Sequence, residues 1–465
     1  MISIFIFRRD LRFHDNTAFI EALKQAKKNN FFLMPIFIFD DRQINNNEFF
    51  SKNAFSFMIN SLEHLNLELK KDNLKLYFFK GIAHEVIEKI ILDFRKKNKK
   101  IFSVYVNKDY TPFSLKRDFL IKNICDKYNV NFFSYSDALL NEPGTLKTYT
   151  IFTPFWKAHS QIPVKKPEKI EIKDYEKSFY NEKIDFEKTL TEIKKEFEDK
   201  ILEIKSSFSY DITNLEEIKK NLLNLTNYEF SRDYPIKNTS FLSAHLKFGT
   251  ISIREAFYFI NEKLGSFHPL LRQLYWRDFF YHIAYNFPDV FGNPFNKKYK
   301  NVKWLLDEKK FNAWKSGLTG FPIVDAGMRQ LNQTGYMHNR VRMIVASFLT
   351  KDLHINWLLG EKYFAQKLID YDPCLNNGNW QWSSSVGCDA QPYFRIFNPW
   401  LQQKKFDPDC LYIKKWLPEL NDLKSAEIHN LEFIDLSFKG INYPKPIVNH
   451  STESKKAIDY FKNIK

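Results

Sequence analysis

The side chains best suited to chemistry concentrate in one stretch, residues 370–399. Three asparagines and two tryptophans fall within seven residues there, at Asn376, Asn377, Asn379, Trp380 and Trp382. Amide groups can hydrogen-bond the edge of a flat heterocycle, while indole rings stack on its faces. The stretch therefore indicates a pocket for a planar ring. A buried turn whose amides bond the protein itself is the structural alternative.

Three shorter strings carry the same kinds of side chain. Asn339 and Met343 stand four residues apart in YMHNRVRM, so they share one face of a helix. Gln273 precedes Trp276 by three residues in LLRQLYWRDFFY, which places an amide beside an indole. The string NTSFLS, residues 238–243, offers hydroxyls and an amide at the start of a helical segment, where backbone N–H groups suit a pyrophosphate. Ser and Thr also cap helices in general.

The sequence contains no hydrolytic constellation. HExxH, GxSxG and acidic clusters with metal-ligand spacing are absent. The eleven histidines are scattered, which favours a structural role for each. The phosphate loops GxGxxG and GxxxxGK are absent as well, so a nucleotide cofactor would have to be held by other groups.

Charge and composition narrow the setting. The chain has 465 residues and a net charge of +15, which favours an anionic partner, either nucleic acid or an acidic membrane surface. Four cysteines without metal spacing favour a reducing, intracellular location, and the first residues do not resemble a secretory signal. The longest apolar run, 31–39, has nine residues, whereas a membrane span needs about 20.

Residues 1–135 alternate short β-rich runs with helical patterns. The expected strands are Ser3–Phe7, Phe32–Phe39, Lys75–Phe79, Phe102–Val106 and Asn131–Tyr135. The expected helices are Ala18–Lys28, Asn53–Leu69, Glu85–Phe94 and Leu115–Tyr128. This alternation predicts an α/β domain with a five-stranded parallel, Rossmann-like sheet that helices cover on both faces. Such sheets bind ligands beyond the carboxyl ends of their strands.

Residues 136–210 are expected to connect this domain to an all-α domain, residues 211–465. From about 164 to 205 the chain is dense in Lys and Glu of mixed sign, which indicates a solvated connector with some helix. Beyond it, apolar residues recur at helical spacing. They predict helices at Ile251–Leu264, which Ser252 would cap, and at Leu270–Tyr285, Met328–Gln333, Arg340–Thr350 and Lys362–Ile369.

Four motifs resemble those of the photolyase/cryptochrome flavoproteins, and most closely the cyclobutane pyrimidine dimer photolyases of class I type. They are RRDLRFHDN at 8–16, TGFPIVDAGMRQLNQTGYMHNRVRM at 319–343, NNGNWQW at 376–382 and YPKPIV at 443–448. The resemblance covers nearly the whole chain apart from the connector. It implies an N-terminal antenna domain and a helical domain that binds FAD and DNA.

The resemblance implies a bound FAD. For the antenna chromophore it leaves four alternatives open, which are a folate, a deazaflavin, a second flavin or none. Gly292 and Asn293 stand near where folate-binding members carry Lys, which disfavours folate. By motif match, the residues that contact FAD are Tyr228, Thr239, Ser240, Phe241, Leu242, Ser243, Arg277, Asn339, Arg342, Asp370, Asp372 and Asn376. Asn376 corresponds to the residue near the reactive ring nitrogen of the flavin.

The resemblance assigns two further sets of residues. Trp304, Trp357 and Trp380 match a path of three tryptophans that carries electrons from the surface to the flavin. Trp276 and Trp382 match the two indoles that flank a dimer flipped out of the duplex. The full set expected to contact the lesion or DNA is Gln273, Trp276, Asn339, Arg340, Met343, Trp382, Arg232 and Gln402.

The implied function is light-driven DNA repair, in which excited, reduced FAD gives an electron to the dimer and the cyclobutane ring splits. The protein is expected to act without a metal, inside the cell, as a monomer and away from membranes. The alternatives are a cryptochrome photoreceptor, a DASH-type single-strand photolyase and a (6–4) photolyase. Asn376 favours repair, because plant-type cryptochromes carry Asp there. Gln273 replaces the Glu of class I enzymes and is typical of (6–4) photolyases, but Asn339 and Met343 occupy the positions of their histidine pair.

Overall fold

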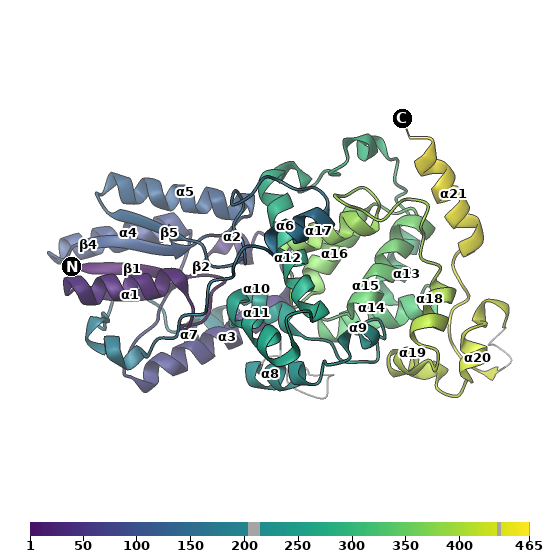
Figure 1. Cartoon of the computed structure of the whole chain (residues 1–465), viewed down its shortest axis with the longest axis horizontal. Coiled ribbons are helices and arrows are strands. Elements are labelled where there is room, and N and C mark those ends of the chain that lie inside the picture. The colour runs from purple at the N-terminus through teal and green to yellow at the C-terminus, as the bar shows by residue number, and fades with distance from the viewer. Residues whose placement is uncertain (203–213, 435–438, 465) are drawn as a thin grey trace.

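A computed structural model describes residues 1–202, 214–434 and 439–464. An α/β lobe and a helical lobe lie side by side along the longest axis of the molecule (Figure 1). The α/β lobe holds one parallel sheet in the strand order β3-β2-β1-β4-β5, which confirms the expected fold. Its strands are β1 (Ile2–Phe7), β2 (Phe32–Phe39), β3 (Tyr77–Lys80), β4 (Ile101–Asn107) and β5 (Asn131–Tyr135).

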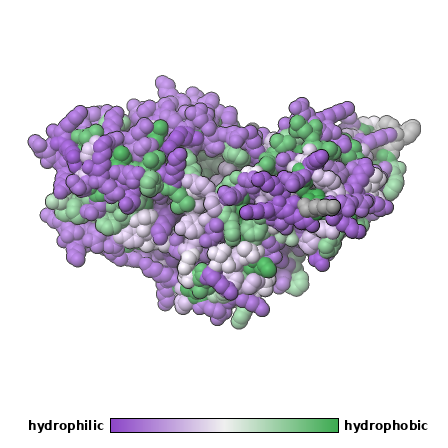
Figure 2. Space-filling view, turned by 90° about the horizontal axis from the view of Figure 1, so that it is seen from above, coloured by the Kyte–Doolittle hydropathy of each residue, from purple (hydrophilic) through white to green (hydrophobic). Residues whose placement is uncertain are grey.

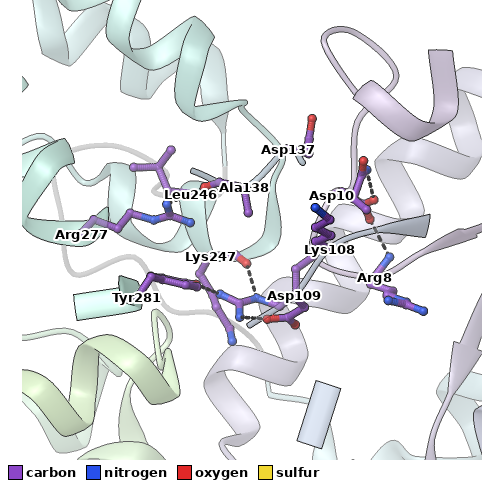
Figure 3. A pocket seen from close by; sticks show the side chains of 12 residues that line it. Arg8, Asp10, Lys108, Asp109, Asp137, Ala138, Leu246, Lys247, Arg277 and Tyr281 are labelled. Carbon is purple, nitrogen blue, oxygen red and sulfur yellow. Dashed lines mark hydrogen bonds and ion pairs between the residues drawn. The ribbon is translucent and has the colours of Figure 1, made fainter. Parts of the chain in front are cut away.

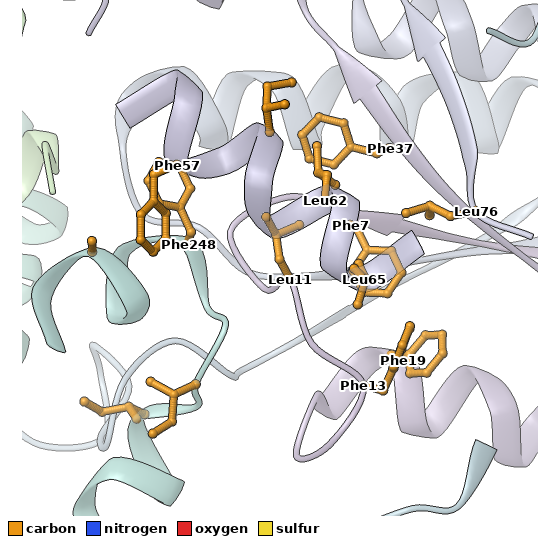
Figure 4. Close-up of a cluster of buried hydrophobic side chains, with 14 of the residues drawn as sticks. Phe7, Leu11, Phe13, Phe19, Phe37, Phe57, Leu62, Leu65, Leu76 and Phe248 are labelled. Atoms are coloured by element: carbon orange, nitrogen blue, oxygen red, sulfur yellow. The ribbon is translucent and has the colours of Figure 1, made fainter. Parts of the chain in front are cut away.

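Helices cover both faces of this sheet, which explains why its strands are so apolar. They are α1 (Thr17–Asn29), α2 (Asp41–Ile44), α3 (Lys52–Lys71), α4 (Ala83–Lys96) and α5 (Pro112–Lys127). Side chains alternate between the faces, so Ile4 and Ile6 of β1 join one core while Phe5 and Phe7 join the other. Helices α4 and α5 pack on the isoleucine face, and α1 and α3 pack on the phenylalanine face, part of which Figure 4 shows.

The segment after β5 packs against both lobes. It forms α6 (Phe152–His159), η1 (Ile172–Ser178), α7 (Leu190–Glu196) and η2 (Glu198–Lys200). The expectation of a solvated connector is wrong for several apolar side chains, since Phe179, Ile193 and Phe197 are buried in the core on the phenylalanine face. Lys and Glu between them face water, and this masked the apolar pattern. Residues 203–210 of the expected connector lie outside the described residues.

The rest of the described chain is helical, as predicted. The principal helices are α8 (Leu215–Leu223), α9 (Tyr228–Ser231), α10 (Leu242–Phe248), α11 (Ile253–Leu264), α12 (Pro269–Asn286), α13 (Glu308–Ser316), α14 (Pro322–Thr334), α15 (Asn339–Ser347), α16 (Trp357–Lys367), α17 (Pro373–Ser383), α18 (Pro399–Phe406), α19 (Leu411–Trp416), α20 (Ser425–Ile428) and α21 (His450–Lys462). Short turns of helix join them at η3 (Pro288–Val290), η4 (Lys297–Asn301), η5 (Phe348–Asp352), η6 (Pro418–Leu420) and η7 (Leu431–Phe433). Ser252 caps α11 in a capping box with Glu255, as predicted. None of the described helices is long and apolar enough to cross a membrane.

The motif RRDLRFHDN joins the two lobes through buried ion pairs. Asp137 binds the guanidinium of Arg12 at 2.6 Å and that of Arg254 at 2.8 Å. Burial raises the pKa of Asp137, but the two arginines outweigh this and hold it below its usual value. Gly249 must lack a side chain, because a Cβ there would lie 2.3 Å from the carbonyl oxygen of Arg9.

A shared apolar core reinforces the junction. Phe57 of α3 stacks on Phe248 of α10, with ring centroids 5.4 Å apart (Figure 4). The space-filling view shows a hollow between the lobes on one face, which is otherwise largely hydrophilic (Figure 2). Because the lobes share ion pairs and a core, side chains from both can be held in fixed positions at their boundary.

Candidate active site

The amide-rich stretch forms a buried helix, α17, and not a turn. Asp372 caps it by accepting hydrogen bonds from the backbone N–H groups of Cys374 and Leu375 at 3.0 and 3.2 Å. Asn377 is tied to the protein, because its Nδ2 donates to Val290 and to the Glu361 carboxyl group. The structural alternative therefore explains Asn377.

Asn376 and Trp380 lie one turn apart on α17, facing α16. The Nδ2 of Asn376 donates to the Glu361 carbonyl oxygen at 2.9 Å. Gly360 of α16 makes room for Trp380, since a Cβ there would lie 2.2 Å from its indole ring. Burial raises the pKa of Glu361 to about 7, so this carboxyl group is readily protonated near neutral pH.

Tyr336 brings three predicted cofactor segments together. Its hydroxyl lies 3.0 Å from Thr239 Oγ1, and its ring centroid lies 5.1 Å from that of Phe241. The guanidinium of Arg342 lies 5.5 Å from the same centroid. Arg342 also binds Asp370 with both terminal nitrogens, at 3.3 and 3.0 Å. The sequence did not single out Tyr336, whose one signal was its place at the head of YMHNRVRM.

Further predicted residues lie at the starts of short helices. Phe241 has a left-handed backbone, with φ of 51°, and directly precedes Leu242, the first residue of α10. Tyr228 begins α9 and is buried. Asn339 begins α15, where its Nδ2 lies 3.8 Å from Met343 Sδ, which confirms that these two share a helical face.

The chemistry of these groups fits FAD. Hydroxyl, amide and guanidinium groups can bind the pyrophosphate and the sugar hydroxyls, and a carboxylate can accept from a sugar hydroxyl. They are supplied by Thr239, Ser240, Ser243, Asn339, Arg342 and Asp370. Asn376 offers an amide for the edge of the isoalloxazine ring.

Two predicted cofactor residues, Arg277 and Asp372, face the boundary between the lobes. Arg277 donates to the Ala138 carbonyl oxygen at 2.6 Å and lies 4.8 Å from the ring centroid of Tyr281. Asp372 binds both Tyr281 and Arg9. Burial raises the pKa of Asp372, but the positive charges of Arg9 and Lys247 and the hydrogen bond from Tyr281 together outweigh this and lower it below its usual value.

Arg277 and Tyr281 of this cluster form one wall of a pocket between the lobes (Figure 3). Its other walls follow the ends of β1 and β4, which are neighbours in the sheet although the chain leaves them in opposite directions. That is the switch point of the sheet, at the carboxyl ends of its strands, where open parallel sheets generally bind ligands. The lining consists of Arg8, Arg9, Asp10, Asn107, Lys108, Asp109, Asp137, Ala138, Leu246, Lys247, Arg277 and Tyr281.

The pocket is rich in positive charge. Five of its lining side chains are basic and three are acidic. Burial and the nearby charge of Arg9 lower the pKa of Lys247 to about 8. Burial raises the pKa of Asp109, but the charges of Arg9 and Arg117 outweigh this and lower it to about 2. The pocket is therefore suited to an anionic ligand that would hold Lys247 in its protonated form.

The predicted lesion-stacking residue Trp276 has aromatic neighbours. Phe152 of α6 stacks on it with ring centroids 3.6 Å apart, and Phe280 lies 5.7 Å away at an interplanar angle of 27°. Trp276 is half-buried on α12, one turn after Gln273. Trp382 is half-buried on α17, which packs against α12. Both indoles therefore stand on adjoining rigid helices.

Arg340 links two segments that carry other predicted DNA contacts. Its Nη2 pairs with Asp233 at 2.7 Å, directly after Arg232 in the chain. Its guanidinium also lies 4.3 Å from the ring centroid of Phe406, in the same helix as Gln402. Arg340 is thus held in place, but its charge is partly neutralised.

The three tryptophans of the expected electron path share one hydrophobic cluster. Trp380 and Trp357 are 3% and 2% exposed, whereas Trp304 is half-buried. Trp304 lies 6.0 Å from Phe461 of α21, measured between ring centroids. Trp380 and Trp357 thus lie in the interior, and Trp304 lies nearer the surface. This is the order expected of a route that leads from the surface to the interior.

Comparison with known proteins agrees with this arrangement. Residues 3–171 match the family description "DNA photolyase", and residues 270–463 match "FAD binding domain of DNA photolyase". A deoxyribodipyrimidine photo-lyase of Alkalihalophilus pseudofirmus is 36% identical, over 98% of this chain and 97% of its own. The chain belongs to the DNA photolyase family. A deoxyribodipyrimidine photo-lyase of Vibrio cholerae is 33% identical over 99% of both chains.

Solved photolyase structures share the fold over the whole chain. An archaeal photolyase of Sulfolobus tokodaii, described with two FAD molecules and a novel light-harvesting cofactor, is 42% identical with a TM-score of 0.86 over 100% of both chains. A bacterial class III photolyase of Agrobacterium tumefaciens is 32% identical with a TM-score of 0.86, over 99% of this chain and 97% of its own. A cryptochrome of Synechocystis is 26% identical with the same TM-score, over 99% of both chains.

Proposed function

We propose that this photolyase splits cyclobutane pyrimidine dimers in DNA. The observation that carries the proposal is that α12 and α15 both pack against α17, so that two sets of side chains stand on adjoining helices. One set has the chemistry to hold FAD and the other to hold a flipped-out dimer. Reduced FAD, when bound and excited by light, supplies the electron that opens the cyclobutane ring.

The protein binds and orients the cofactor. Thr239, held by Tyr336, and the neighbouring serine hydroxyls are placed for the pyrophosphate and ribityl chain. Arg342 is kept in position by its two bonds to Asp370, so that its guanidinium charge would be held beside the cofactor. Asn376 supplies an amide at the ring edge, fixed through its bond to α16.

The same helices bind the lesion. A dimer stacks poorly in the duplex, which lowers the cost of flipping it out. Trp276 and Trp382 then offer flat walls, and stacking on an aromatic side chain is worth ~1–3 kcal/mol per base. Gln273, Asn339 and Met343 complete the pocket, because an amide can both donate to and accept from a thymine edge.

Basic side chains position the DNA around this pocket. Arg232 and Arg340, with Gln402, stand on segments that Arg340 holds together. The net charge of +15 supports a track along the phosphate backbone. Since the substrate is DNA, we place the protein inside the cell, and we propose that it acts as a monomer.

Trp380, Trp357 and Trp304 supply electrons from the surface. Their step from buried to half-buried supports this role. The pocket between the lobes is the proposed site of a second chromophore. Its position at the switch point and its positive charge support an anionic flavin more than a neutral ring. The two FAD molecules described for the Sulfolobus tokodaii relative support the same assignment.

The decisive experiment is to purify the protein, record its chromophore spectrum and illuminate it with dimer-containing oligonucleotides. Light-dependent loss of dimers in duplex DNA, with none in the dark, is the expected result. Repair confined to single strands would assign it to the DASH type. Repair of (6–4) lesions would overturn the proposed substrate. Absence of repair in either strand context, with intact flavin absorption, would favour a photoreceptor.

A further inference from the structure

Trp380 contacts a second buried indole that lies outside the three-tryptophan path. The ring centroid of Trp314, in α13, is 6.2 Å from that of Trp380, with planes inclined by 71°. Trp314 has no exposed surface. Within the part of the chain that the structure describes, the rings in contact with Trp380 are those of Trp314 and Phe364. Trp314 is therefore a redox-active side chain in direct contact with Trp380, from which an electron could pass to an oxidised Trp380.

Trp314 leads on to a tyrosine near the surface. The ring centroid of Tyr363, in α16, lies 5.8 Å from that of Trp314. Tyr363 is half-buried, and its hydroxyl donates to Asn332 Oδ1 at 2.6 Å. Asn332 is exposed to water. The three rings therefore form a continuous chain from the helix of Asn376 to a hydrogen-bonded phenol with an outlet for its proton.

We propose that Trp314 and Tyr363 form a second branch that supplies electrons to Trp380. The branch rests on the role proposed for Trp380. Once Trp380 has lost an electron to a light-excited oxidised flavin, Trp314 replaces that electron and Tyr363 then reduces Trp314. The phenol proton leaves to water beside Asn332. An external thiol returns one electron and one proton to the tyrosyl radical, and two thiyl radicals couple to a disulfide.

The surroundings of each ring fit its part. The indole N–H of Trp314 donates to the Val345 carbonyl oxygen at 3.0 Å, and the ring is sealed from water. An oxidised Trp314 therefore keeps its proton and can be reduced again without waiting for one. This is the property of a relay and not of an end point.

Tyr363 has the opposite properties. Its proton can leave, and the Nζ atoms of Lys367 and Lys315 lie 5.6 and 6.0 Å from its ring centroid. These positive charges oppose a cationic ring and favour a neutral radical that has released its proton. Oxidation therefore ends at Tyr363, where an external thiol can reach it.

The test uses the flavin-loaded protein in a Trp357→Phe background, which cuts the path to Trp304. It also cuts the path to Tyr299 and Tyr393, whose rings contact Phe461 of α21. Electron paramagnetic resonance after a light flash, with and without ring-deuterated tyrosine, measures the tyrosyl radical. We expect a radical in this background and its loss on adding Tyr363→Phe or Trp314→Phe. Trp400→Phe is the matched control, since Trp400 is buried in the same core without contacting Trp380.

The outcomes separate the branch from the function on which it rests. If Trp380→Phe leaves light-induced radicals in place, the proposed role of Trp380 is wrong and the branch is wrong with it. If Trp380 is required but Tyr363→Phe keeps the full tyrosyl signal, the branch alone is overturned. Tyr363→Phe keeps the ring at a half-buried position, and flavin absorption of each variant reports whether it has folded.

Discussion

Phe152 and Trp276 form a parallel stack, with ring centroids 3.6 Å apart and planes inclined by 10°. Phe152 begins α6, which precedes the helical lobe in sequence. Arg272 extends the stack, since its guanidinium lies 5.3 Å from the ring centroid of Phe152 and 4.7 Å from that of Trp156. A segment outside the recognised motifs thus fixes a wall of the proposed lesion pocket.

Replacing Phe152 should weaken lesion binding without removing FAD. In Phe152→Leu, Trp276 loses its stacking partner, and an aromatic pair is worth ~0.5–1.5 kcal/mol beyond the burial of its area. Affinity for a dimer-containing duplex should therefore fall about two- to tenfold. Titration of labelled duplex measures this, and bound flavin absorption should stay constant.

Phe155→Leu is the control for this substitution. Phe155 is buried on the same helix but stacks on His159 and contacts Phe279, not Trp276. It should lower stability without a selective effect on lesion affinity. Equal losses of affinity in the two variants would show that the Phe152 stack does not position the wall.

Arg340 should bind DNA against competition from Asp233. A phosphate must draw the guanidinium from a carboxylate that lies 2.7 Å away. We expect Asp233→Asn to raise affinity by no more than about fivefold, because exposed or partly exposed ion pairs are worth ~0.2–1 kcal/mol. Arg340→Ala should lower it and reduce the salt slope by about 0.9 per lost phosphate contact.

The salt dependence of wild type provides the reference. If several phosphates are neutralised, the logarithm of the binding constant should fall with the logarithm of the salt concentration with a slope of about −3 to −6, at ~0.9 per phosphate. A flat response would mean that the charge of +15 is a compositional feature without a DNA track. If the Arg340→Ala variant keeps the salt slope of wild type, Arg340 does not contact a DNA phosphate.

Hydrophobic patterning predicted the elements well, because burial sets their periodicity. The bounds of β2 and β5 agree with the prediction, but the strand expected from Lys75 begins at Tyr77. Leu76 is buried, yet ladder pairing starts where Tyr77 meets Ile36 of β2. The hydrophobic pattern of a sequence indicates which residues are buried, but it does not indicate which residues form hydrogen bonds to a neighbouring strand. The prediction of Met328–Gln333 likewise found only the second half of α14.

The site was less predictable, since its contacts join segments far apart in the chain. The motif match named Thr239 and Arg342, but Tyr336, which lies between them, had no signal of its own. Asp372 was expected to contact FAD, whereas in the structure it forms an ion pair with Arg9. This ion pair forms only because the two lobes pack together. Spacing within one segment cannot encode such a contact.

Binding of an anionic chromophore between the lobes should weaken as pH rises through about 8, the lowered pKa of Lys247. Above that pH the side chain loses the charge that attracts the ligand. Fluorescence titration with additional FAD, between about pH 7 and about pH 9, measures the effect, whereas an ordinary Lys, with a pKa near 10.4, would give almost none in this range. Lys247→Arg should abolish the pH dependence, and a decline that persists in that variant would assign it to another group.

Trp380→Phe should nearly abolish photoreduction of oxidised FAD, because both electron routes converge on this indole. Repair by chemically reduced protein should survive, since the routes feed the cofactor and not the lesion. Absorption spectra recorded during illumination with a thiol measure the photoreduction of FAD. Loss of dimers from DNA measures repair by the chemically reduced protein. Trp416→Phe, equally buried in the same core, is the control. Unchanged photoreduction in Trp380→Phe would contradict the assignment.

Gln273 should permit dimer repair, but with a lower lesion affinity or repair yield than Glu would give at this position. It lies one turn from Trp276 on α12, and its amide can replace a carboxylate in number of hydrogen bonds, although without the charge. A neutral hydrogen bond is worth ~0.5–1.5 kcal/mol and a charge-assisted one ~1.5–3 kcal/mol. Gln273→Glu should therefore improve lesion affinity or repair yield by no more than about tenfold. Dimer repair assays on both proteins, in single and double strands, measure the gain.

Two outcomes would contradict this account of Gln273. If wild type repairs no dimers in either strand context while Gln273→Glu does, the amide marks a change from repair to photoreception. If wild type repairs (6–4) lesions, the amide outweighs Asn339 and Met343, which carry no imidazole to protonate such a lesion. Gln273→Ala separates hydrogen bonding from shape. It should lose affinity relative to wild type, because a thymine edge buried between the two indoles would be left without a partner.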